Sequence, residues 1–138
     1  MFKAIAHNPF WKTYGLLLAR IIMGGVFIMA SYFKFQDING TAMYISNVGF
    51  PIPLILAWVA AFFELTLGLA IIFGVWFSEA ALLLGVYAIF LGFAFHGPSL
   101  WKGNRMEFGF FVDHFVMFAG LLYMAGHGVG NAWSLKKS

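Results

Sequence analysis

The chain has 138 residues, of which 62% are hydrophobic and 9% charged, with a formal charge of +3 and no cysteine. Soluble domains carry about 25% charged residues, so this composition excludes a water-exposed globular surface and indicates a protein that sits in lipid. The missing cysteine excludes disulfides and thiolate chemistry within the chain. The few basic residues lie mainly at segment ends, which argues against a nucleic-acid-binding face.

Four stretches are apolar and long enough to cross a bilayer as helices, which takes about 20 residues. They cover residues 14–33, 53–77, 79–95 and 108–126. No strand-length alternation is visible, and backbone groups in lipid must be paired internally, so the spans are expected to be helices. The sequence therefore predicts a single domain over residues 1–138, an all-α integral membrane bundle of four transmembrane helices.

The connections between the spans differ in length. Ser78 and Glu79 follow the second span so closely that the second and third spans are predicted to be antiparallel neighbours. Ser78 would cap the third helix, and Glu79 would suit its first turn. Residues 41–48 are predicted to form a short interfacial helix between the first and second spans. Gly49 would end this helix, and Pro53 would start the next one.

An even number of spans places both termini on the same side of the membrane. The bases on that side are Lys3, Lys12, Lys136 and Lys137, and those on the other side are Lys34, Lys102 and Arg105. Cytoplasmic segments carry the excess of lysine and arginine, so this difference favours cytoplasmic termini.

Ionisable residues within the spans are costly in lipid, so each one is a candidate functional residue. Arg20 lies about two turns into the first span, and Glu64 lies near the middle of the second. Either charge alone would be strongly destabilising, and the long arginine side chain could reach the carboxylate. We therefore expect an intramembrane ion pair between Arg20 and Glu64. Its role is either to fix helix register or to take part in chemistry or transport.

A second group of polar residues lies toward the side of the membrane opposite the termini. Lys34 and His96 end their helices there, and Asp113 and His114 lie within about two turns of the same side. We expect them to surround an outward-facing pocket with Glu64 at its floor. The candidate catalytic residues are thus Lys34, Glu64, His96 and Asp113, and the candidate cofactor-binding residues are Lys34, His96, Asp113 and His114.

Each of these residues also has a structural interpretation. Lys34 could extend to the lipid headgroups, and His96 could cap a helix end. His114 is about 100° around its helix from Asp113 and could face a neighbouring helix instead. The sequence has no phosphate-binding glycine loop, zinc-protease motif or serine elbow, and we predict no metal site, although His96, His114 and Asp113 together would be the alternative.

Several short motifs follow one another along the chain: Arg20-x3-Gly24-x2-Phe27-x3-Ser31-x2-Lys34, Gly49-Phe50-Pro51, Glu64-Leu65-x2-Gly68 with Gly74, His96, Gly128-Val129-Gly130 and Trp133-Ser134-Leu135. Taken in this order, they resemble the DoxX family of small bacterial membrane proteins. Four positions depart from the family pattern. Ser31 stands where glycine is more usual, Lys136 replaces an acid, and Asp113-His114 replaces a Lys-Asn-like pair.

The resemblance implies a four-helix bundle in the bacterial cytoplasmic membrane and a link to oxidoreductases. Members of the family resemble the membrane subunit of thiosulfate:quinone oxidoreductase, others are linked to oxidative-stress complexes, and distant relatives look like chaperones for receptor assembly. A shared fold does not by itself fix the activity.

Three functions therefore compete. The chain could be an accessory or scaffold subunit that binds another membrane protein or a second copy of itself. It could bind quinone as an oxidoreductase subunit in its own right, with Lys34, His96 and Asp113 serving the carbonyl oxygens and a proton route. The electrons would then come from a partner or bound ligand, and quinone is the one cofactor suggested. It could also be a small carrier for a hydrophobic or anionic molecule, although no inverted repeat supports this.

Overall fold

A computed structural model describes residues 7–135, and over that range it contains helices and no strand. The elements are η1 (Trp11–Gly15), α2 (Leu16–Gln36), α3 (Ile38–Asn47), α4 (Pro53–Phe73), α5 (Phe77–His96), η2 (Pro98–Leu100) and α6 (Arg105–His127). Four helical segments are long and apolar enough to cross a membrane: Trp11–Gln36, Pro53–Phe73, Phe77–Leu100 and Arg105–His127. The predicted all-α bundle with four spans is confirmed.

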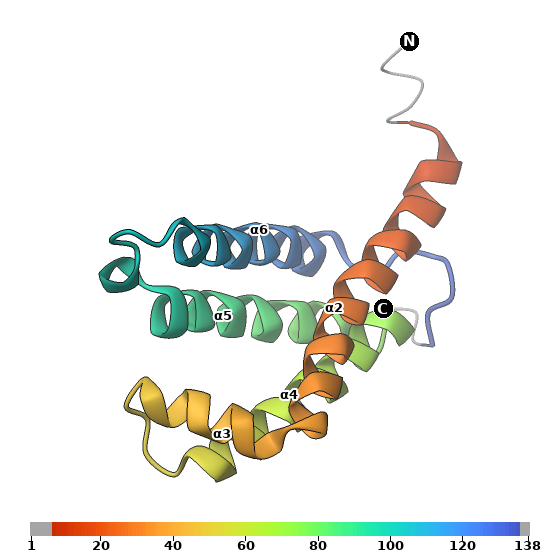
Figure 1. Ribbon diagram of the computed structural model, residues 1–138. Helices are drawn as coiled ribbons and strands as arrows, with labels where there is room; N and C mark the ends of the chain where they lie inside the picture. The colour runs from red at the N-terminus through yellow and green to blue at the C-terminus, as the bar shows by residue number, and fades with distance from the viewer. Residues whose placement is uncertain (1–6, 136–138) are drawn as a thin grey trace.

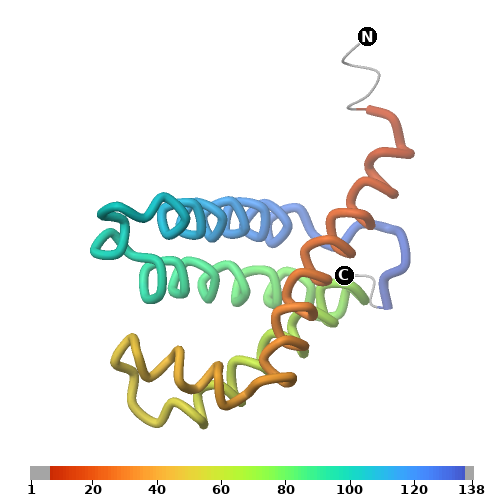
Figure 2. The backbone as a smooth tube through the Cα atoms, viewed as in Figure 1, coloured from red at the N-terminus to blue at the C-terminus, as the bar shows by residue number. Residues whose placement is uncertain are grey.

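The long helices form two antiparallel pairs (Figure 1). Helix α2 packs along α4, and α5 packs along α6. The short helix α3 folds back against α4. The backbone trace shows α3 and the α5–α6 connection at one end of the molecule, while η1 and the last described residues lie toward the other (Figure 2). We call these the α3 end and the terminal end.

Glycine allows α2 and α4 to approach closely. A Cβ atom on Gly24 would lie 2.6 Å from the carbonyl oxygen of Gly68, and a Cβ on Gly68 would lie 2.9 Å from the carbonyl oxygen of Gly24. Both distances are shorter than real Cβ contacts, so the crossing requires glycine on both helices. In lipid such close packing replaces the hydrophobic effect as the force that holds helices together.

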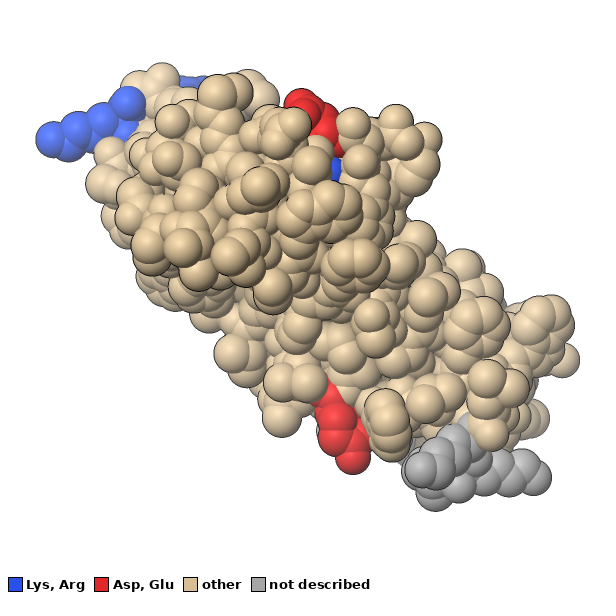
Figure 3. Space-filling view, turned by 90° about the horizontal axis from the view of Figure 1, so that it is seen from below, with Lys and Arg blue, Asp and Glu red and all other residues tan. Residues whose placement is uncertain are grey.

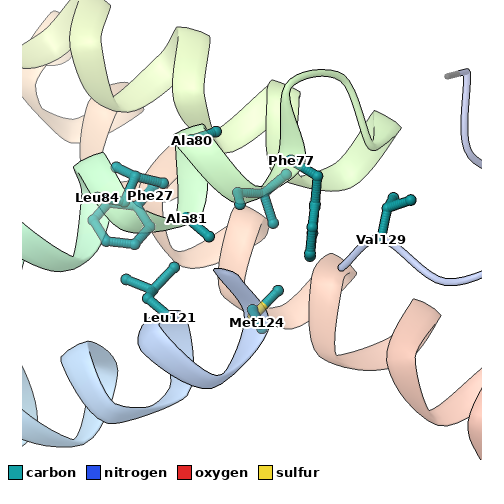
Figure 4. Close-up of a cluster of buried hydrophobic side chains, with 9 residues drawn as sticks. Phe27, Phe77, Ala80, Ala81, Leu84, Leu121, Met124 and Val129 are labelled. Atoms are coloured by element: carbon teal, nitrogen blue, oxygen red, sulfur yellow. The ribbon is translucent and has the colours of Figure 1, made fainter. Parts of the chain in front are cut away.

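The two pairs meet in a core near the terminal end (Figure 4). Its buried residues are Phe27, Ile71, Phe77, Ala80, Ala81, Leu84, Leu121, Met124 and Val129. Every long helix contributes to this set, so the core joins the α2–α4 pair to the α5–α6 pair. The closing segment after α6 contributes Val129.

The outside of the bundle is largely apolar. Large hydrophobic side chains are exposed along all four spans, for example Ile22, Val59, Phe90 and Val116. The space-filling view shows charged atoms toward the ends of the molecule and an uncharged surface between them (Figure 3). Such a surface suits contact with lipid.

The turn between the second and third spans differs from the prediction. Helix α4 ends at Phe73, and α5 starts at Phe77, so the break lies before Ser78. Gly74 adopts a left-handed conformation with φ 69°, which glycine tolerates at little cost, and it ends α4. Ser78 lies inside α5 and does not cap it, so that prediction is wrong, whereas Glu79 does lie in the first turn.

The short helix α3 starts earlier than residues 41–48 suggest. The Asp37 carboxylate accepts a 2.8 Å hydrogen bond from the Gly40 N–H, and the Thr41 hydroxyl donates to the Asp37 carbonyl. Asp37 therefore caps a helix that begins at Ile38. The predicted stop at Gly49 agrees with its left-handed φ of 93°. Lys3, Lys136 and Lys137, which supported the predicted orientation, lie outside the described residues.

Candidate functional site

A cavity of about 810 Å³ lies at the α3 end. It is lined by the last turns of α2, by α3, by the first half of α4, by the second half of α5 and by His114 of α6. Its apolar wall is rich in aromatic side chains, and its polar lining residues are Lys34, Asp37, Thr41, Tyr44, Tyr87, His96 and His114. Small-molecule sites typically have volumes of about 300–1,000 Å³ and a few polar groups set among apolar ones.

Glu64 accepts hydrogen bonds from two side chains that line this cavity. The Lys34 Nζ donates to Oε2 at 2.8 Å, and the Tyr87 hydroxyl donates to Oε1 at 2.7 Å. The Glu64 side chain is 2% exposed and the Lys34 side chain 23%, so the carboxylate is buried beneath the ammonium group. One N–H of the ammonium is used, and lysine carries three, so Lys34 retains donors for a bound molecule.

Arg20 does not pair with Glu64, so the predicted ion pair is wrong. Arg20 is 1% exposed, and its guanidinium lies against the end of α4 and the segment after α6. Its donors point to five backbone carbonyl oxygens, which belong to Ile71, Ile72, Val129, Ala132 and Trp133. We call this arrangement the Arg20 cluster.

The Arg20 cluster has a clear physical cause. The last four carbonyls of a helix lack intrahelical partners, and Ile71 and Ile72 lie in the last turn of α4. The segment after α6 folds over this helix end, and the N–H of Leu135 donates to the carbonyl of Phe73. Arg20 thus donates hydrogen bonds to a group of backbone carbonyl oxygens. Glu64 lies seven residues before Ile71, about 10 Å along α4.

His96 belongs to the cavity and is held from two sides. Its Nδ1 lies 2.7 Å from the Glu107 carboxylate, and its carbonyl accepts a 2.8 Å hydrogen bond from the Trp101 indole N–H. Glu107 was not predicted, because residues 97–107 have the composition of a loop. The signal was Asn104, whose side chain caps α6 by accepting from the N–H groups of Met106 and Glu107.

His114 lines the cavity, and Asp113 does not. The ring centroids of His114 and His96 are 5.2 Å apart, and the His114 Nδ1 donates to the Phe110 carbonyl at 2.7 Å. Asp113 is exposed on the other side of α6. The predicted grouping of Asp113 with Lys34 is therefore wrong, while the grouping of Lys34, His96 and His114 is present.

Contact between helices decides which of these neighbouring residues faces inward. A Cβ atom on Gly92 of α5 would lie 3.0 Å from the Cβ of His114. Gly92 thus provides the space in which His114 packs against α5, and Asp113 is turned away by about 100°. Within residues 7–135, no group of three or more His, Asp or Glu side chains is arranged to hold a metal ion.

Two tyrosines were not predicted as site residues. Tyr87 is the only tyrosine in its span, and a buried tyrosine hydroxyl usually has a hydrogen-bonding partner, which here is Glu64. Tyr44 lies on α3 and stacks on Phe95 with ring centroids 5.2 Å apart. Burial raises the pKa of the Tyr44 hydroxyl, and the negative charge of Glu107 raises it further, so this hydroxyl stays protonated at neutral pH.

The chain is similar to bacterial inner membrane proteins. It is 31% identical to the inner membrane protein YphA of Escherichia coli over 62% of this chain and 60% of that protein. It is 30% identical to the inner membrane protein YqjF of Escherichia coli over 89% of this chain and 90% of that protein.

A third relative is the "Putative oxidoreductase CatD" of Bacillus subtilis, which is 37% identical over 44% of this chain and 43% of that protein. The alignments thus cover less than two thirds of YphA and CatD. No solved structure matches the chain significantly.

The DoxX family profile matches residues 15–97, which include Lys34, Tyr87 and His96 of the cavity lining and the buried Glu64 beneath them. The match to YqjF extends across nearly the whole of both proteins. On both grounds, this four-span membrane protein belongs to the DoxX family.

Proposed function

We propose that this protein binds a neutral quinone-class ring in the cavity at its α3 end and acts as an accessory membrane subunit of an inner-membrane redox system. One observation carries the proposal: an aromatic-walled cavity of about 810 Å³ contains a lysine that is fixed by a buried carboxylate. A flat apolar ring suits such walls, and a ring carbonyl requires a hydrogen-bond donor.

Lys34 is the donor for that carbonyl. Glu64 fixes its position, and Tyr87 in turn holds Glu64, so the ammonium group is oriented before a ligand binds. A donor that is already oriented loses little entropy on binding. Electron density that accumulates on the carbonyl oxygen during reduction would be stabilised by the positive charge of Lys34.

The charges around the cavity favour a neutral ligand over an anionic one. Asp37 lines the cavity, Glu64 lies beneath Lys34, and Glu107 lies behind His96. Lys34 is already paired with Glu64, and His96 with Glu107, so neither side chain offers an unpaired positive charge to an anion, and Asp37 would repel one. The carrier alternative for an anionic molecule is therefore the weaker candidate.

Electrons must come from outside the chain. The sequence has no cysteine to hold an iron–sulfur cluster. The protein would therefore exchange electrons through the bound ring with a partner protein, which makes it a subunit of a larger system. The name of CatD supports an oxidoreductase role for one relative. The names of YphA and YqjF support an inner-membrane location.

The first test asks what the protein carries. The chain is extracted into native-lipid nanodiscs, and mass spectrometry identifies the small molecules and proteins that co-purify. A bound quinone supports the proposal. Binding of menadione, a soluble naphthoquinone, is then measured against empty nanodiscs. The absence of cysteine excludes thiol addition to this probe. A protein that carries no quinone and does not bind menadione above the empty nanodiscs contradicts the proposal.

The variant for this test must remove the Lys34 ammonium group without leaving the Glu64 carboxylate unpaired. Lys34→Met alone would leave a buried carboxylate unpaired, so the double variant Lys34→Met with Glu64→Gln is used. Loss of one charge-assisted hydrogen bond predicts menadione affinity about tenfold lower. Lys102→Met removes an exposed lysine outside the cavity lining and is the matched control. Equal menadione affinity in the double variant and the control would remove Lys34 from the site.

A further inference from the structure

The two histidines of the cavity have their Nδ1 atoms already engaged. The His96 Nδ1 lies 2.7 Å from Glu107, and the His114 Nδ1 lies 2.7 Å from the carbonyl of Phe110. A carbonyl oxygen only accepts hydrogen bonds, so the Nδ1 of His114 carries the proton. No hydrogen bond within residues 7–135 uses the Nε2 atom of either ring.

A neutral imidazole carries one donor and one acceptor. Because Nδ1 is the donor in His114, its Nε2 is an acceptor. The Nδ1 of His96 also has its partner, the Glu107 carboxylate. Both rings line the cavity, with centroids 5.2 Å apart. This end of the cavity therefore offers the acceptor atom of His114, whereas Lys34 offers donors.

The position of His114 is fixed on two further sides. Its hydrogen bond runs to the carbonyl four residues earlier in α6, and its Cβ packs against the bare backbone of Gly92. The ring cannot exchange its two nitrogens without losing the bond to Phe110. The acceptor atom is thus available to a ligand in a fixed direction.

We propose that His114, with His96 beside it, selects ligands whose ring carries a hydroxyl group. The hydroxyl donates its hydrogen bond to the His114 Nε2. This inference rests on the proposed function and narrows it: the cavity takes the reduced, hydroxyl-bearing form of a quinone-class ring, or a phenol of similar size, in preference to a ring that has only acceptors.

The neighbouring charges agree with this selection. Glu107 of α6 contacts His96, Asp37 lines the cavity at the N-cap of α3, and Lys34 of α2 has its charge balanced by Glu64. The Tyr44 hydroxyl on α3 remains a neutral donor. A neutral hydroxyl can donate to His114 without bringing a negative charge near Glu107.

The test compares two probes that have the same ring. 1-Naphthol can donate a hydrogen bond, and 1-methoxynaphthalene cannot. Their binding to the full chain in nanodiscs is measured by equilibrium dialysis at about pH 8, where free imidazole is neutral, with empty nanodiscs subtracted to remove lipid partitioning. Menadione is measured in parallel. Wild-type protein should bind 1-naphthol about tenfold more tightly than 1-methoxynaphthalene, because the ether would leave the imidazole acceptor unpaired.

His114→Phe keeps a flat ring and removes the acceptor. It should abolish the preference while retaining the binding of 1-methoxynaphthalene, which also shows that the variant is folded. His127→Phe makes the same change at a ring that stacks on Tyr123 and is absent from the cavity lining, so it should keep the preference.

Two results would overturn the inference. One is equal binding of the two naphthalene probes by wild-type protein, a comparison that needs no variant. The other is a preference that persists in His114→Phe. If menadione still binds in either case, the proposed function survives and only the hydroxyl selection fails. If none of the three probes binds above empty nanodiscs, the proposed function fails as well.

Discussion

Arg20 contacts backbone carbonyls and is not among the residues that line the cavity, so we expect it to contribute to stability. Its planar guanidinium reaches five carbonyl oxygens from two separate segments of the chain. A lysine side chain ends in a compact ammonium group, which cannot reproduce the planar, forked arrangement of guanidinium donors. In a site that is 1% exposed, the carbonyls left without a donor are not rescued by water.

Arg20→Lys should therefore lower the free energy of unfolding by about 3 kcal/mol. Thermal unfolding in nanodiscs, followed by circular dichroism, measures the effect. Arg105→Lys makes the same change at an exposed position and should leave the unfolding midpoint unchanged. Equal midpoints for the two variants would contradict the role assigned to the Arg20 cluster.

The Lys34–Glu64 pair predicts a different pattern. Removing one partner leaves a buried charge, so Lys34→Met should destabilise the protein by about 3 kcal/mol. Adding Glu64→Gln removes that charge and keeps an acceptor for Tyr87, so the double variant should recover most of the loss. A double-mutant cycle on thermal unfolding measures the coupling. Simple addition of the two single effects would show that Glu64 is not buried as a charged partner of Lys34.

At the level of the helices, Gly24 is the critical residue of the α2–α4 crossing. A methyl group there would lie 2.6 Å from both the Gly68 carbonyl oxygen and the Ile72 side chain. The neighbouring Gly25 has nothing within 4 Å of such a methyl group. Gly24→Ala should therefore destabilise the protein by about 2 kcal/mol through overpacking.

Gly25→Ala is the matched control for this prediction. Alanine favours helix over glycine by about 1 kcal/mol, so Gly25→Ala should be neutral or slightly stabilising. The unfolding midpoints of the two variants, measured in the same lipid, decide the matter. If Gly24→Ala matches Gly25→Ala, the two helices do not cross as closely as described.

The helices themselves could be predicted from the sequence, but their ends could not always be. Runs of apolar residues locate the spans, because a helix that crosses the hydrocarbon core needs about 20 mostly apolar residues. The break between α4 and α5 was misplaced because Ser78 is a typical cap, whereas Trp76, with φ 43°, is a rare residue in a left-handed turn. The predicted range of residues 41–48 omits the first turn of α3, because this helix begins at Ile38 and is capped by the Asp37 side chain.

Several of the polar residues of the site could be predicted from the sequence, but not which of them contact one another. Ionisable side chains are unfavourable in lipid, and this marked Arg20, Lys34, Glu64 and His96 as candidate functional residues. The positions of Lys34 and His96 at helix ends on the same side of the membrane predicted that these two lie close together. The partners of Arg20 are backbone carbonyls, which every sequence has and no pattern marks. His114 faces inward, and not Asp113, because His114 packs against Gly92 of the neighbouring helix. The spacing of residues within one helix does not predict a contact with another helix.

On the scale of the whole molecule, the Arg20 cluster links the segment after α6 to the α2–α4 pair. Ending the chain at Gly130 removes the carbonyls of Ala132 and Trp133 from the cluster. The truncated protein should unfold at a lower temperature, and Arg20→Lys should cost less in it than in the full chain, since fewer contacts remain to be lost. Arg105→Lys in the truncated background is the control. Fully additive effects would contradict the link.

The two ends of the molecule also differ in how they should open over time. At the terminal end, five hydrogen bonds and a packed core join all four spans. At the α3 end, one short helix rests mainly on α4, and an aromatic-walled space lies behind it. Backbone amides of residues 38–47 should therefore exchange with deuterium much sooner than those of residues 68–73. Breathing of α3 would let a flat molecule pass from the bilayer into the protein while the opposite end stays closed.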